Sequence, residues 1–152
     1  MVTVTVLACS TIFSGYFPLV FTYIPCYFIN VRIFKNKWFH RFAAKEGITD
    51  SELKEIVQQL ENGQFYADLG SGVYKMRIAR QSEGKKGGSF RLIVLFKSEF
   101  RTFFIYGFSK SKMGNIEDDL LLGYKKQAKA RFLLTEEQIN QWLKNKTLIE
   151  IL

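Results

Sequence analysis

Three consecutive runs of β-branched and aromatic residues constrain the fold of this chain more than any other feature. They span Val73–Ala79, Ser89–Phe96 and Thr102–Phe108, and each is bounded by glycine, serine or charged residues. The two later runs are nearly continuously apolar, which is typical of central strands that helices cover on at least one face. The sequence therefore predicts a meander of three strands that helices cover on at least one face.

The first of these runs alternates between apolar and charged residues. Tyr74, Met76 and Ile78 are predicted to point to one face of the sheet, because successive side chains of a strand point to opposite faces. Lys75 and Arg77 are then predicted to share the other face.

The net charge of the chain is concentrated in the same region. Ten of the 22 Lys and Arg residues lie between Lys75 and Lys112, with only two of the 14 acidic residues. The rest of the chain is balanced, so the meander carries the whole formal charge of +8. A basic sheet with interspersed aromatic residues indicates a nucleic-acid-binding surface. The alternative is a solvated sheet face with scattered cations.

Residues 1–30 differ from the rest of the chain because no charged residue precedes Arg32. The run Leu7–Ile29 is long enough to suggest a membrane span. Gly15, Pro18 and Pro25 interrupt a helix there, and a signal peptide would need a basic start. We favour a third interpretation, an extension from an upstream start codon. We therefore expect a domain over residues 31–152, no stable membrane association and a cytoplasmic location.

Helix signals flank the meander on both sides. Apolar residues from Trp38 to Ala43 recur at helical spacing, and Gly47 is a plausible stop. Capping boxes are predicted at 49–52 and at 135–138, and acidic residues at 117–119 suit the first turn of another helix. Short strands are predicted at 31–34 and 148–152.

Common catalytic motifs and metal-ligand patterns are absent. Cys9 and Cys26 match no zinc-binding spacing, and the chain has no Walker loop and no metalloprotease motif. The meander also lacks the paired carboxylates that glycosidase or two-metal chemistry requires. We expect no metal or cofactor. His40, the single histidine, is more consistent with a surface or packing residue than with a catalytic one.

The only catalytic chemistry that the residues of the meander could support is one based on lysine, arginine and tyrosine side chains. Cleavage of RNA by its own 2′-hydroxyl needs a base, charge stabilisation at the phosphate and an acid at the leaving oxygen. Lysine, arginine and tyrosine can supply these functions if proximity lowers the pKa of a lysine. Antiparallel pairing could bring Arg91 close to Lys75 and Arg77. The glycine-rich loop 81–88 could contact phosphate or simply connect a hairpin, and Lys110 and Lys112 follow the third strand.

From Arg32 to its end, the chain resembles the RelE-like toxins of type II toxin–antitoxin systems, in the RelE/ParE superfamily. The resemblance rests on FKNKWFHRFAAKEGI, ADLGSGVYKMRIAR, the GKKGG turn with SFRLIVLF, FFIYGFSKSKMGNI and the closing TLIEIL. It implies an α+β fold with N-terminal helices packed on a twisted, mainly antiparallel sheet. The helices predicted after Asn115 would be additions to that core.

The resemblance also implies a function. Such toxins are ribosome-dependent mRNA endoribonucleases that inhibit translation and are neutralised by a cognate antitoxin, here expected to be a helix-turn-helix DNA-binding protein. The family's cationic residues correspond best to Arg77 and Arg91. The remaining candidates are Lys75 and Tyr106 for catalysis, and Arg80, Lys85, Lys86, Lys110 and Lys112 for RNA binding. The alternatives are a non-enzymatic, ParE-like DNA gyrase poison and a degenerate toxin that only binds its antitoxin.

Overall fold

The computed structural model describes residues 31–79, 88–98, 100–109 and 116–152. The apolar segment 1–30 lies outside these residues, so its origin stays a prediction. In the part of the chain that is described, no helix is long and apolar enough to cross a membrane.

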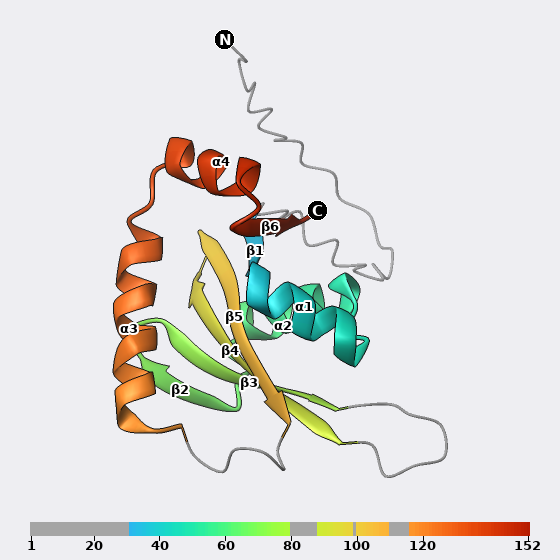
Figure 1. Ribbon diagram of the computed structural model, residues 1–152. Coiled ribbons are helices and arrows are strands. Elements are labelled where there is room, and N and C mark those ends of the chain that lie inside the picture. The colour runs from blue at the N-terminus through green and yellow to red at the C-terminus, as the bar shows by residue number, and fades with distance from the viewer. Residues whose placement is uncertain (1–30, 80–87, 99, 110–115) are drawn as a thin grey trace, which may run out of the picture.

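A single six-stranded sheet forms the centre of the protein (Figure 1), in the strand order β2-β3-β4-β5-β1-β6. The strands are β1 (Arg32–Asn36), β2 (Ala67–Gly70), β3 (Val73–Ala79), β4 (Ser89–Lys97), β5 (Arg101–Ser109) and β6 (Leu148–Ile151). Neighbouring strands run antiparallel except for β1 and β5, which are parallel. The predicted α+β class with a mainly antiparallel sheet is therefore confirmed, and the three predicted central strands are β3, β4 and β5.

Strand β2 was not predicted from the sequence. It is only four residues long, and it pairs with β3 through a turn at residues 70–72. Gly70, Ser71 and Gly72 all have positive φ in this turn, a conformation that glycine adopts without steric penalty. A side chain at position 72 would also meet the Phe132 ring, because a Cβ there would lie 2.8 Å from it.

Helix α1 (Lys37–Glu46) begins where β1 ends. The Asn36 side chain caps it by accepting a hydrogen bond from the backbone N–H of Phe39 at 2.6 Å. The Asn36 amide also donates to the carbonyl of Ile105, which ties the start of the helix to β5. Gly47 ends the helix in the left-handed conformation, as predicted.

Both predicted capping boxes are present. Thr49 and Glu52 bond reciprocally at the start of α2 (Asp50–Glu61), and Thr135 and Gln138 do the same for α4 (Glu136–Lys144). In the remaining helix, α3 (Asp118–Phe132), Asp118 and Asp119 lie in the first turn as predicted, and Glu117 is the N-cap residue. Local sequence thus fixes where these helices begin.

The helices cover both faces of the sheet. Apolar residues of α1 and α2 pack with one set of strand residues, which includes Met76, Leu92 and Phe104. A second apolar cluster lies on the opposite face, where α3 and α4 pack over strand residues that include Ile93 and Phe103. Figure 1 shows α3 on the side of the sheet opposite to α1 and α2. Alternating residues of the central strands are therefore buried against different helices.

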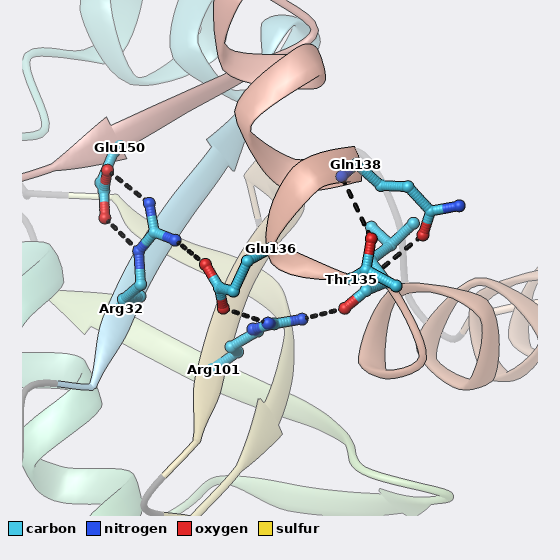
Figure 2. Close-up of polar contacts among 7 residues, drawn as sticks. Arg32, Arg101, Thr135, Glu136, Gln138 and Glu150 are labelled. Carbon is cyan, nitrogen blue, oxygen red and sulfur yellow. Dashed lines mark hydrogen bonds and ion pairs between the residues drawn. The ribbon is translucent and has the colours of Figure 1, made fainter.

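A charged network holds the C-terminal helices on the sheet (Figure 2). The side chain of Arg101, only 5% exposed, donates to the carbonyl of Leu134 at 2.6 Å and to the Glu136 carboxylate. Glu136 also accepts from Arg32, which pairs with Glu150 at 2.7 Å. The hydrogen bond from Arg101 is the main reason why the pKa of Glu136 lies below its ordinary value. The network links β5, β1 and β6 to the connection between α3 and α4.

Candidate functional site

Three of the predicted cationic residues come together on β3 and β4. The antiparallel register places Arg77 directly opposite Arg91, and Lys75 opposite Ile93. Directly opposed residues share a face of the sheet. Met76, between the two β3 cations, lies in the core beneath α1 and α2. The cationic cluster Lys75, Arg77 and Arg91 therefore lies on the other face, the one that α3 partly covers.

Lys75 is buried in this cluster, with 7% of the residue exposed. Burial lowers the pKa of its ammonium group below the ordinary value, and the positive charge of Arg91 lowers it further. The neighbouring Tyr66 acts in the opposite direction. Lys75 can therefore give up its proton more easily than an ordinary surface lysine, which is the property that a general base requires.

Arg91 is held by an aromatic ring and has no carboxylate partner in the described part of the chain. Its guanidinium lies 4.7 Å from the centre of the Tyr66 ring. Its Nε is buried and makes no hydrogen bond within the described residues. An arginine without a carboxylate partner can bind a phosphate oxygen without first breaking an ion pair.

Tyr66 is the residue of this site that sequence reasoning missed. Its backbone N–H donates to the carbonyl of Lys75 at 3.1 Å, which fixes it beside the cluster. Half of the residue is exposed. The only signal in the sequence was an aromatic pair, Phe65 and Tyr66, in a stretch otherwise treated as a connection, and that signal did not indicate its partners.

Tyr106 lies on the same level of the sheet as Lys75 but two strands away. The register aligns Lys75 with Ile93, and Ile93 with Tyr106. Adjacent strands are about 4.8 Å apart, so the two backbones are separated by about 10 Å. The Tyr106 ring stacks on Trp38 of α1 at 4.4 Å and lies 6.3 Å from Tyr124 of α3. Tyr106 is thus at the border of the cluster and not in contact with its cations.

The other predicted RNA-binding residues cannot be placed. Arg80, Lys85, Lys86, Lys110 and Lys112 all lie outside the described residues, in segments that directly follow β3 and β5. They stay predictions. His40 is exposed on α1, on the surface. In the described ranges, no group of three or more histidine, cysteine or acidic side chains could hold a metal ion.

The described surface also has a hollow on the α2 side of Arg77. It measures about 530 Å³ and lies beside α2, where Glu46, Glu52 and Glu55 line it together with Arg77. The three glutamates in this lining disfavour the binding of a polyanion. For a phosphate-bearing ligand, the sheet face around Arg91 is therefore the better site.

The arrangement has the groups that metal-free RNA cleavage requires. Lys75 can accept a proton, and the two arginines can stabilise charge on a phosphate. Tyr66 beside Arg91 and Tyr106 at the border of the cluster each carry a phenolic hydroxyl.

Comparison with known proteins gives one family. Residues 31–151 match the family model described as the RelE toxin of the RelE / RelB toxin-antitoxin system. No curated protein matches the chain in a sequence search.

Proposed function

This chain belongs to the RelE toxin family of the RelE/RelB toxin–antitoxin systems, and on that premise we propose that it is a ribosome-dependent mRNA endoribonuclease. The observation that carries the proposal is the pairing of Arg77 with Arg91 beside the buried Lys75. Its partners would be the ribosome and mRNA, with a helix-turn-helix antitoxin as the neutralising protein. It would act in the cytoplasm.

The proposed reaction uses the RNA as its own nucleophile. Lys75, in its neutral form, takes the proton of the 2′-hydroxyl, and the 2′-oxygen forms a bond to the adjacent phosphorus. Arg77 and Arg91 stabilise the negative charge that builds on the phosphate oxygens. The bond to the 5′-oxygen breaks, which leaves a 2′,3′-cyclic phosphate on one fragment and a 5′-hydroxyl on the other.

The leaving 5′-oxygen needs a proton, and a tyrosine hydroxyl is the proposed donor. Tyr106 borders the cluster on the β5 side, while Tyr66 lies under Arg91. Replacing each tyrosine singly by phenylalanine shows which of the two is the proton donor, because the change removes the hydroxyl and keeps the ring. The variant that lacks the acid should lose cleavage with little loss of folding stability.

The proposal is tested by inducing the chain in cells and mapping the ends of mRNA. Wild-type protein should give cuts in phase with codons, and Arg91→Ala should give none while remaining folded. Loss of a charge-stabilising donor in a catalytic site typically costs about 2.7–4 kcal/mol of barrier, or a factor of about 10² to 10³. Intact mRNA together with a DNA-damage response would instead support the gyrase poison. An Arg91→Ala protein that cuts as fast as wild type would remove the cluster from the mechanism.

A further inference from the structure

An aromatic series runs around the free edge of β5, away from the cationic cluster. Strand β1 pairs with β5 only as far as Phe104, and α1 begins beyond that point. The Trp38 ring stacks on Tyr106 at 4.4 Å, and the Phe42 ring lies 5.5 Å from Trp38 with the two planes 9° apart. The Trp38 ring thus contacts both Tyr106, which borders the cationic cluster, and Phe42 of α1.

Gly107 makes the close approach of this series to the strand possible. A Cβ at position 107 would overlap the Phe42 ring. The absence of a side chain there allows Phe42 to lie directly on β5. Trp38, next to it, is 44% exposed as a whole residue, although tryptophan is usually well buried in a folded domain. An exposed indole that neighbouring rings hold in place is a rigid surface, and little conformational entropy is lost when a ligand binds it.

The same series borders a basic hollow. The hollow measures about 470 Å³, and its lining includes Trp38, Phe42, Tyr106 and the side chains of Arg41 and Lys45. Glu46 also lies at its border. Arg41 and Lys45 are exposed, and neither forms an ion pair with any residue that the structure describes. Aromatic rings combined with free cations are the usual means of binding single-stranded nucleic acid.

We propose that single-stranded RNA continues from the cationic cluster around the free edge of β5, where an unpaired base stacks on Trp38 and the adjacent phosphates contact Arg41 and Lys45. This inference rests on the proposed function, because it describes a second contact of the same RNA substrate. The base contact is independent of sequence, since every base has a flat face. The acidic hollow beside α2 cannot take this role.

The test uses the intrinsic fluorescence of Trp38. The chain has two tryptophans, Trp38 and Trp142, so Trp142→Phe in the full-length chain isolates the signal of Trp38. The probe is a single-stranded 2′-O-methyl RNA, which binds like RNA but cannot be cleaved through its 2′-oxygen. We expect saturable quenching of Trp38 and, for Trp38→Leu measured by probe anisotropy, an affinity lower by about tenfold or more.

The cations are tested by salt dependence. Each lost phosphate contact lowers the slope of log K against log salt by about 0.7 for a single strand. The double replacement of Arg41 and Lys45 by alanine should therefore reduce the slope by about 1.4. Lys54→Ala is the matched control, because Lys54 is an exposed cation on α2 away from the hollow. It should leave the slope unchanged.

The outcomes separate this inference from the proposed function. Normal mRNA cleavage without quenching of Trp38 would overturn the inference and leave the enzyme intact. Quenching without cleavage would leave the RNA contact standing and refute the nuclease. If Trp38→Leu binds RNA normally but loses affinity for a RelB-type antitoxin, the hollow is a protein-binding surface and the inference is wrong.

Discussion

Replacement of Arg101 by methionine should destabilise the protein strongly, although Arg101 lies far from the cationic cluster along β5. Methionine keeps most of the apolar stem and removes both of the hydrogen bonds that the guanidinium donates. One of them goes to the Leu134 carbonyl at 2.6 Å and the other to the Glu136 carboxylate. The guanidinium also lies 4.4 Å from the centre of the Phe100 ring, a contact that methionine replaces only in part.

The size of the effect follows from the exposure of the two acceptors. A hydrogen bond to a charged group contributes about 1.5–3 kcal/mol. The Glu136 side chain is 60% exposed and keeps its contact with Arg32, so its carboxylate regains water and the loss falls in the lower half of that range. The neutral carbonyl bond adds about 1 kcal/mol. We expect Arg101→Met to lose about 2.5–3.3 kcal/mol of unfolding free energy, or roughly 5–13 °C in Tm.

Urea denaturation followed by circular dichroism measures this loss. Lys129→Met is the control, because it removes an exposed cation from α3 and should change the unfolding free energy by less than about 0.5 kcal/mol. Equal denaturation midpoints for Arg101→Met and wild type would refute the view that this network holds α3 and α4 on the sheet.

Three further predictions concern stability and its dependence on pH. Burial lowers the pKa of Lys75 in the folded state, so the protonated side chain destabilises the fold at every pH below the folded pKa. Lys75→Met should therefore raise the melting temperature at pH 7 while abolishing mRNA cleavage. A less stable variant would contradict this. Hydrogen bonds and charge from Arg101 and Arg32 keep the pKa of Glu136 below its ordinary value of 4.5, so its stabilisation is fully present above that pH and is lost as pH falls through the lower folded pKa. Glu136→Gln should be less stable than wild type at pH 7, and in urea titrations the difference should shrink as pH falls below 4.5. Gly107→Ala should cost about 1–3 kcal/mol, because the added methyl group displaces the Phe42 ring, and a shifted Trp38 emission maximum measured with the denaturation midpoint would report it.

Sequence reasoning was most successful where structure depends on neighbouring residues. The capping boxes at Thr49 and Thr135 and the stop at Gly47 were all predicted, because a helix end is determined by the few residues around it. The alternation of β3 likewise predicted which residues share a face, and the register that places Arg77 opposite Arg91 agrees with it.

The pairing of strands that are far apart in the chain could not be predicted from the sequence. Nothing in β1 indicates that it runs parallel to β5, because that pairing joins residues about 70 positions apart. Strand β2 is too short for its alternation to be recognised, and with it the position of Tyr66 was missed.

The count of charges in the meander also grouped together cations that have different roles in the structure. Arg101 belongs to the basic meander in the sequence, yet it is buried and bonded to Glu136 at the other end of β5. Arg91, only ten residues earlier, forms no ion pair with any of the described residues. A count of cations cannot distinguish a structural ion pair from a cation that is available to a phosphate.

The most direct test of the proposed function is cleavage in a purified translation system. Messenger RNA is incubated with the protein in the presence and absence of ribosomes, and the fragment ends are mapped and analysed for 2′,3′-cyclic phosphate. We expect codon-phased cuts only with ribosomes, a rate about 10² to 10³ lower for Arg91→Ala, and an unchanged rate for Lys129→Met. Equal rates for wild type and a folded Arg91→Ala, or mRNA that stays intact on ribosomes, would contradict the assignment of the β3–β4 cations to mRNA cleavage.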